Sequence, residues 1–226
     1  PYTTLFRSAD VLTALGVKVD AEIPALERCL RDCNIAFLMA PKFHSAMRHV
    51  APVRQELGIR TIFNLLGPLS NPANPAYQLL GVYDPMWLEP FAHALAELGT
   101  KAAWVVHGND GLDELTITGL SKVVELKDGQ IREFEVSPED AGLPRASLEE
   151  LKGGDADYNA QALNHALSGM KSVYRNAVVY NAAAGLVIAG KAADLKVGAA
   201  IAAEAIDSGA AHTTLSRLVM KSNEPV

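Results

Sequence analysis

Apolar and polar residues along this chain follow a helical period in some segments and a strand period in others. Apolar positions three and four residues apart, bounded by capping residues and glycines, predict a series of helices. These helices are expected at about 8–15, 23–33, 45–57, 85–98, 155–167, 177–189, 193–208 and 211–220. Short apolar runs predict buried strands at 35–39, 77–83 and 102–106. One irregular stretch, 64–72, is rich in Gly, Pro and Asn and predicts a structured loop.

The pattern changes at residues 122–136, where it predicts an antiparallel hairpin. Two alternating segments, 122–127 and 130–136, flank Asp128-Gly129, and Asp-Gly is a strong signal for a two-residue turn. Together with the alternation of helices and strands elsewhere, this predicts an α/β fold. We expect a mainly parallel sheet flanked by helices, with one antiparallel hairpin attached.

Composition narrows the class of protein. The chain has 226 residues, 49% of them apolar, and a net charge of −6, which suffices for one large domain or one and a half smaller ones. A mildly acidic chain is a poor general binder of nucleic acid, because little in it would displace phosphate counterions. No apolar run is long enough to span a bilayer, so no membrane partner is expected. We interpret Cys29 and Cys33 as reduced thiols of a cytoplasmic protein.

A first cluster of candidate ligand-binding residues runs from Pro41 to Arg54. If its second part is helical, Met47, Val50 and Arg54 lie on one face. An arginine among apolar residues suits an aromatic carboxylate, because the guanidinium grips the carboxylate while the apolar neighbours hold the ring. The alternative is a solvated surface arginine, and helix spacing by itself favours that alternative.

A second cluster follows the predicted strand at 102–106 and runs from His107 to Glu114. Loops at the carboxyl ends of parallel strands commonly bind ligands. The adjacent acids Asp113 and Glu114 suit Mg²⁺, which takes one or two carboxylates together with water and phosphate oxygens. An acidic turn explains the same residues equally well. His107 is interpreted as a loop residue with satisfied hydrogen bonds rather than as a general base.

A third cluster, 180–185, is rich in small residues. Small side chains let a helix approach its neighbours closely, so this stretch predicts tight helix packing. No chemistry is assigned to it.

Taken in order and with their spacing, these segments resemble anthranilate phosphoribosyltransferases over residues 8–220. The stretches that carry the resemblance include 8–16, 40–54, 58–72, Gln78-Leu-Leu-Gly-Val82, 106–108, Asp110-Gly-Leu-Asp-Glu114, 153–155, 181–184 and 204–209. The resemblance implies a small helical domain, expected to be mostly missing here, and a larger α/β domain of the nucleoside phosphorylase and phosphoribosyltransferase type, with the active site of the family in the cleft between them. It also implies a homodimer formed through the helical domain.

The resemblance assigns roles to individual residues. Asp113 and Glu114 match the acidic pair that binds Mg²⁺ beside the pyrophosphate of the donor, phosphoribosyl pyrophosphate. Arg54 matches the arginine that holds the carboxylate of anthranilate. His44, Met47, Pro41 and Pro68 fall where the family lines its anthranilate channel, although position 47 is often aromatic there. Ser8 matches a serine that contacts phosphoribosyl pyrophosphate.

The start of the chain departs from the family pattern. The family's Gly-Thr-Gly-Gly-Asp loop and its Lys-His-Gly-Asn stretch are both expected before Ser8 and are absent, and Arg7 stands where the family usually has Gly. Residues 1–8 resemble the translation of a sequencing adapter. We therefore expect residues 1–8 to be a non-native segment. Ser8 lies at its boundary and could belong either to that segment or to the native chain. An α/β glycosyltransferase domain that binds phosphoribosyl pyrophosphate and anthranilate is expected at 9–220, followed by a tail at 221–226. Such a shortened chain is expected to be inactive by itself.

Two other readings stay open at this point. A pyrimidine-nucleoside phosphorylase shares the fold, but the Arg54 segment and the pair Asp113-Glu114 favour the anthranilate enzyme. A non-catalytic relative that retains the anthranilate pocket is the alternative from another class.

Overall fold

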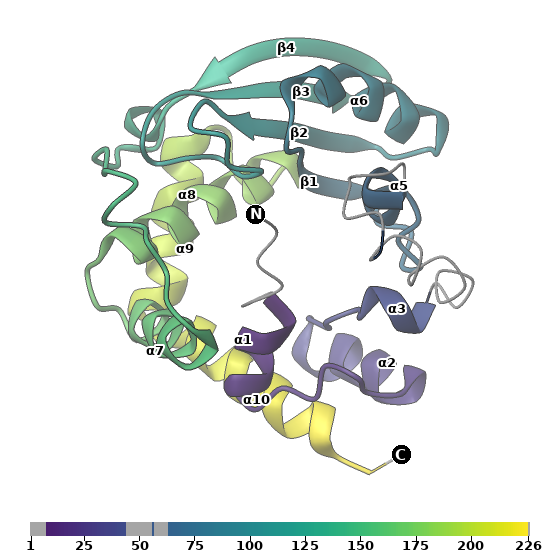
Figure 1. Cartoon of the computed structure of the whole chain (residues 1–226), viewed down its shortest axis with the longest axis vertical. Coiled ribbons are helices and arrows are strands. Elements are labelled where there is room, and N and C mark those ends of the chain that lie inside the picture. The colour runs from purple at the N-terminus through teal and green to yellow at the C-terminus, as the bar shows by residue number, and fades with distance from the viewer. Residues whose placement is uncertain (1–7, 44–55, 57–62, 226) are drawn as a thin grey trace. The chain divides into compact units, whose positions relative to one another are not determined.

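The structure is a computed structural model that describes residues 8–43, 56 and 63–225 (Figure 1). The chain divides into two compact units, each built from separate stretches. The first unit contains Pro1–Pro72, Gly153–Ser168 and Gly209–Val226, and the second contains Ala73–Lys152 and Gly169–Ser208.

The second unit is built on a four-stranded sheet (Figure 1). Its strands, in spatial order, are β1 (Tyr77–Gly81), β2 (Ala102–Gly108), β3 (Ser121–Lys127) and β4 (Gln130–Val136). Strands β1 and β2 are parallel, whereas β2–β3 and β3–β4 are antiparallel. The predicted hairpin is confirmed, and both turn residues have positive φ, 50° at Asp128 and 77° at Gly129, as a type I′ turn requires.

The predicted α/β class is confirmed, but the balance of strand directions differs from the expectation. Within the described residues the sheet is mixed rather than mainly parallel. The reason is local: residues 109–120 lead from β2 directly into the adjacent β3 without a helical crossover, and a direct return of this kind produces an antiparallel pair.

Helices cover the sheet of the second unit. They are η1 (Pro85–Trp87), α6 (Leu88–Glu97), η2 (Pro138–Ala141), α8 (Val173–Ile188) and α9 (Leu195–Asp207). Helix α6 packs on β2 and β3, and α8 packs on β1 and β2. Helix α8 begins four residues before the predicted start, because the side chain of Ser172 accepts a hydrogen bond from the backbone N–H of Arg175 and caps the helix there.

The small residues of 180–185 do pack closely. A Cβ atom on Gly198 of α9 would lie 2.8 Å from the carbonyl oxygen of Ala183 in α8, so the two helix backbones approach one another without side chains between them. Tyr180, Ala183 and Ala184 are buried. The packing interpretation of this stretch is confirmed.

A row of aligned side chains crosses three strands of the sheet. Trp104, Glu125 and Arg132 occupy paired positions on β2, β3 and β4. The indole Nε1–H of Trp104 donates to Glu125 Oε1 at 2.9 Å, and Arg132 Nε donates to the other oxygen, Oε2. Phe134 completes the group, edge-on to Trp104 with ring centroids 5.3 Å apart. The carboxylate of Glu125, which is only 7% exposed, is therefore paired on both oxygens.

The first unit is helical in its described part. Its elements are α1 (Ser8–Ala14), α2 (Ile23–Cys33), α3 (Ala40–Phe43), α5 (Phe63–Leu69), α7 (Ala156–Leu167) and α10 (Ala210–Asn223). Helix α10 packs on α2 and α7, and α1 packs on α7. The guanidinium of Arg28 in α2 donates to the carbonyl oxygens of Lys221 and Glu224, which ties α2 to the end of α10.

Two predictions for the first unit were wrong, and one lies outside the described residues. The apolar run at 35–39 is not a strand. Ala36 and Leu38 instead pack, half-buried, against the cluster of Ala21, Ala25 and Leu26. The predicted loop at 64–72 is helical in its first part, as α5. The helix predicted at 45–57 lies in the part of the chain that the structure does not describe, apart from residue 56.

None of the helices in the described ranges is both long and apolar enough to cross a bilayer.

Candidate active site

The loop between β2 and β3, residues 109–120, carries the predicted acidic pair. It begins with a tight turn in which the N–H of Gly108 donates to the carbonyl of Leu112 at 2.8 Å, and the N–H of Gly111 donates to the carbonyl of Gly108 at 2.9 Å. Gly111 has φ +90°, a conformation that favours glycine. Asp113 and Glu114 follow directly after this turn.

Asp110 holds the loop together from within. Its Oδ2 accepts hydrogen bonds from the hydroxyls of Thr116 at 2.5 Å and Thr118 at 2.7 Å, and its Oδ1 accepts from the N–H of Leu112 at 3.2 Å. Burial acts to raise the pKa of Asp110, but these hydrogen bonds together outweigh it and leave the pKa below its usual value. The carboxylate of Asp110 is thus occupied by hydrogen bonds that stabilise the loop.

The loop also rests against the end of β1. A Cβ atom on Gly81 would lie 1.6 Å from the carbonyl oxygen of Asp113, so only a residue without a side chain fits at that position. Close by in the sheet, the Nδ1 of buried His107 lies 2.8 Å from the carbonyl oxygen of Val82, and since that oxygen only accepts, the ring nitrogen donates. His107 is therefore a structural residue with a satisfied hydrogen bond, as predicted, although it lies in strand β2 and not in the loop where it was expected.

Helix α8 holds the far side of the loop through Asn181. The Oδ1 of Asn181 accepts a hydrogen bond from the N–H of Leu115 at 3.1 Å, and its Nδ2 donates to the carbonyl of Leu115 at 3.0 Å. No local pattern in the sequence indicates the role of Asn181, because its partner Leu115 lies 66 residues away. Thr116 and Thr118 alternate along the chain and follow Asp110 closely, which is a local pattern that could have indicated their hydrogen bonds.

The two carboxyls of the acidic pair are close enough to influence each other. Asp113 and Glu114 are both exposed residues, and among the described residues neither forms an ion pair with a basic side chain. The protein around the Glu114 carboxyl nevertheless excludes enough water to raise its pKa, and the adjacent negative charge of Asp113 raises it further. A cation at this position would relieve both effects.

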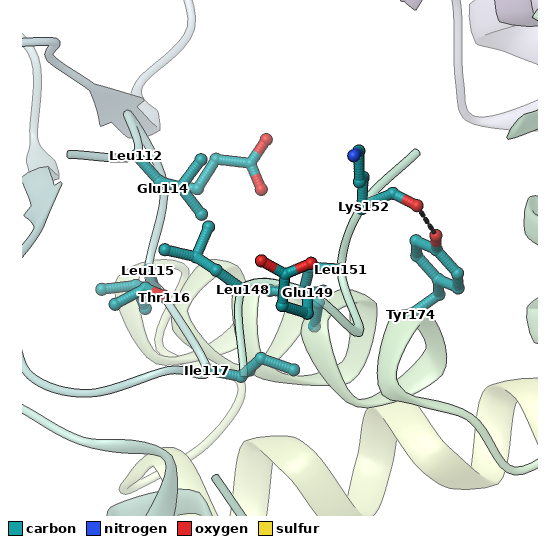
Figure 2. A pocket seen from close by; sticks show the side chains of 11 residues that line it. Leu112, Glu114, Leu115, Thr116, Ile117, Leu148, Glu149, Leu151, Lys152 and Tyr174 are labelled. Carbon is teal, nitrogen blue, oxygen red and sulfur yellow. Dashed lines mark hydrogen bonds between the residues drawn. The ribbon is translucent and has the colours of Figure 1, made fainter. Parts of the chain in front are cut away.

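Glu114 also lines a cavity of about 530 Å³ within the second unit (Figure 2). Its walls come from the loop, from the segment before Gly153 and from the start of α8, with Leu115, Ile117 and Leu148 among the apolar lining residues. The hydroxyl of Tyr174 donates to the carbonyl of Lys152 at 2.8 Å and holds the second wall. In Figure 2 the carboxylate of Glu114 reaches toward the open space that faces Lys152 and Tyr174. A volume of this size accommodates a small organic ligand.

The other predicted site residues lie in the first unit or outside the described residues. Ser8 is the first residue of α1 and is exposed, and Pro68 lies exposed within α5. Pro41 belongs to α3. His44, Met47 and Arg54 lie outside the described residues, so their assigned roles stay predictions.

The second unit thus belongs to the α/β proteins that present acidic residues on a loop at the carboxyl end of a parallel strand, a position that such proteins use to bind ligands. The sequence makes the assignment specific. Residues 6–212 match the family described as "Glycosyl transferase family, a/b domain", and the chain belongs to that family.

Individual relatives are anthranilate phosphoribosyltransferases. The chain is 56% identical over 221 residues to that of Parvibaculum lavamentivorans, which covers 98% of this chain and 65% of the relative. It is 58% identical over 217 residues to that of Beijerinckia indica, covering 96% of this chain and 64% of the relative. The chain therefore spans slightly less than two thirds of the length of these curated relatives.

Solved structures agree with this resemblance. Anthranilate phosphoribosyltransferase from Thermus thermophilus superposes with a TM-score of 0.89 at 46% identity, over 96% of this chain and 64% of that one. The Saccharomyces cerevisiae enzyme in complex with PRPP and Mg gives a TM-score of 0.87 at 28% identity, over 95% of this chain and 62% of that one. The family resemblance found in the sequence is confirmed.

Proposed function

We propose that this protein is an anthranilate phosphoribosyltransferase of tryptophan biosynthesis. It transfers the phosphoribosyl group of phosphoribosyl pyrophosphate to the amine of anthranilate, giving N-(5-phosphoribosyl)anthranilate and pyrophosphate. The observation that carries the proposal is the adjacent pair Asp113-Glu114 on the loop after β2, which forms no ion pair among the described residues, in a chain 56% identical to an enzyme of that name.

The acidic pair suits Mg²⁺. The two adjacent carboxylates form no ion pair with a basic side chain among the described residues, and burial of the Glu114 carboxyl, together with the negative charge of Asp113, raises the pKa of Glu114. Mg²⁺ needs only one or two protein carboxylates when water and substrate phosphates complete its coordination. Asp113 and Glu114 are the residues that would hold it. When bound, Mg²⁺ neutralises negative charge that develops on the pyrophosphate leaving group.

The proposed role of Arg54 is to position the acceptor. Its guanidinium donates two parallel hydrogen bonds to the carboxylate of anthranilate, so that the amine faces C1 of the ribose. The bond from C1 to the pyrophosphate oxygen breaks, the bond from C1 to the amine nitrogen forms, and the amine gives up one proton. C1 develops positive charge in the transition state, as in other glycosyl transfers. We assign no general base, because a neutral aromatic amine needs little activation.

We also propose that the protein forms a homodimer, because of its resemblance to the family, and that it is located in the cytoplasm. Support for the second point comes from two buried free thiols, Cys29 and Cys33, which suit a reducing compartment. Light scattering coupled to size-exclusion chromatography tests the dimer.

The deciding experiment uses a chimera at the length of the relatives. The residues that precede the matched region in the Parvibaculum lavamentivorans relative are joined to residues 9–226 of this chain. We expect the chimera to deplete the fluorescence of anthranilate in a reaction that needs both phosphoribosyl pyrophosphate and Mg²⁺. Anthranilate binding without turnover in the chimera would mean a non-catalytic relative. Phosphorolysis of pyrimidine nucleosides would mean a phosphorylase.

A further inference from the structure

We infer that Asn181 is the positioning residue for the acidic pair: its side-chain amide, on α8, fixes the backbone that carries Glu114. The inference rests on the proposed metal role of Asp113 and Glu114, and it adds a residue from a distant part of the chain to that site.

The amide of Asn181 is fully engaged. Its oxygen accepts from the N–H of Leu115, while its nitrogen donates to the carbonyl of Leu115 at 3.0 Å and to the carbonyl of Ala177, one turn earlier in α8, at 3.1 Å. The bond to Ala177 anchors the side chain to its own helix. The two bonds to Leu115 then reproduce the pair of hydrogen bonds that a neighbouring strand would make.

Leu115 directly follows Glu114, so the N–H that Asn181 accepts from belongs to the peptide that joins these two residues, and the carbonyl to which Asn181 donates belongs to the next peptide. Leu115 is only 2% exposed, which leaves its backbone groups without access to water if the amide is removed. On the other side of Glu114, the carbonyl of Asp113, which belongs to the peptide that joins the two acids, lies against Gly81. The backbone of Glu114 is therefore held between two fixed points, one on β1 and one on α8, although its side chain is exposed.

Residues that hydrogen-bond to a metal ligand, or to the backbone that carries it, fix the orientation of that ligand. Asn181 is placed to act on Glu114 in this way. Removing such a supporting partner typically weakens metal affinity by roughly 10- to 100-fold, because the ligand loses its orientation. If Asn181 merely satisfied buried backbone groups, its removal would lower the melting temperature of the chain and leave metal affinity unchanged.

The experiment measures Mn²⁺, a paramagnetic substitute for Mg²⁺, bound to the 226-residue chain by electron paramagnetic resonance at a temperature well below unfolding. The variants are Asn181→Leu, which keeps the volume, and Asn181→Ala, which avoids a clash if the leucine is not accommodated. Ser172→Ala is the matched control, because it removes the cap of the same helix without touching the loop. Glu114→Gln reports on the metal site itself.

We expect both Asn181 variants to bind Mn²⁺ roughly 10-fold more weakly and to show faster hydrogen exchange at the N–H of Leu115. Ser172→Ala should lower the melting temperature and leave Mn²⁺ affinity unchanged. Unchanged affinity in the Asn181 variants, with weakened affinity in Glu114→Gln, would overturn the role of Asn181 and leave the proposed function standing. Unchanged affinity in Glu114→Gln, or no saturable binding by the unaltered chain, would overturn the metal role and this inference with it.

Discussion

Gly81 at the end of β1 lies against the carbonyl of Asp113, at a distance that leaves no room for a methyl group. A Cβ atom there would sit 1.6 Å from the oxygen and 2.4 Å from the carbonyl carbon of Asp113. Both contacting atoms are backbone, so the conflict cannot be resolved by rotating a side chain. The edge of the sheet and the acidic loop must keep their present separation.

Gly81→Ala is therefore expected to push the loop away from β1. We expect a loss of about 1–3 kcal/mol in the free energy of unfolding, the usual cost of overpacking, together with weaker Mn²⁺ binding. Urea unfolding and Mn²⁺ titration measure the two effects. Gly185→Ala is the control in the same unit, because Gly185 has open space around it within α8. It should stabilise the protein by about 0.5–1 kcal/mol. A Gly81→Ala variant with normal stability would show that the loop is free to move.

Asp110→Asn should make stability less dependent on acid pH. Because the pKa of Asp110 is lower in the folded protein than in the unfolded chain, its stabilising contribution is complete above the unfolded pKa of about 4. That contribution is lost as the pH falls through the lower folded pKa. We expect the variant to be less stable at pH 7 by roughly 1.5–3 kcal/mol, the range for a hydrogen bond to a charged group. The difference from the original should shrink on acidification. Urea unfolding at several pH values tests this, and a difference that is constant with pH would contradict it.

Glu114→Gln should show the opposite dependence on pH. The folded pKa of Glu114 is raised, so the folded state is penalised as the pH rises through that value, and the penalty is absent below the unfolded pKa of about 4.3. We expect the variant to melt at a higher temperature than the original at pH 7, and at the same temperature near pH 4. Mg²⁺ should raise the melting temperature of the original only. Equal stabilisation of both proteins by Mg²⁺ would argue for a metal site elsewhere.

Trp104→Phe should destabilise the second unit by removing one of the two donors to Glu125. The carboxylate is 7% exposed, so Oε1 would be left buried without a partner. We expect a loss of about 1–3 kcal/mol, measured by thermal unfolding. The double variant Trp104→Phe with Glu125→Leu removes both polar groups and should recover part of the loss. If the double variant is as unstable as the sum of the two single ones, the hydrogen bond contributes little.

The sequence predicted most helix positions because the signals that start and stop helices are local. Asp155 was expected to open a helix, and its side chain accepts from the N–H of Tyr158. The turn at Asp128-Gly129 was equally clear, since few dipeptides adopt two positive φ angles. The prediction of a strand at 35–39 was wrong because periodicity does not distinguish an apolar run that enters a sheet from one that packs against a helix.

The position of the acidic pair on the loop after β2 could be predicted from the sequence, because an apolar strand and a Gly-containing turn precede it; its role as a metal site stays a prediction. What holds the pair in place was not found. The contacts of Gly81 with Asp113 and of Asn181 with Leu115 join distant positions, and no spacing rule connects them. A glycine in a strand and an asparagine in a helix are each ordinary in isolation, and only the fold shows what they face.

The division of the chain also has a consequence for biosynthesis. The α/β unit ends at Ser208, whereas the helical unit still needs α10, whose residues pack on α2 and α7. Helix α2 is synthesised before the α/β unit, whereas α10, which packs on it, is synthesised after that unit. The apolar face of α2 therefore stays uncovered while the α/β unit is completed, and chaperones that bind exposed apolar helices would contact it during that interval.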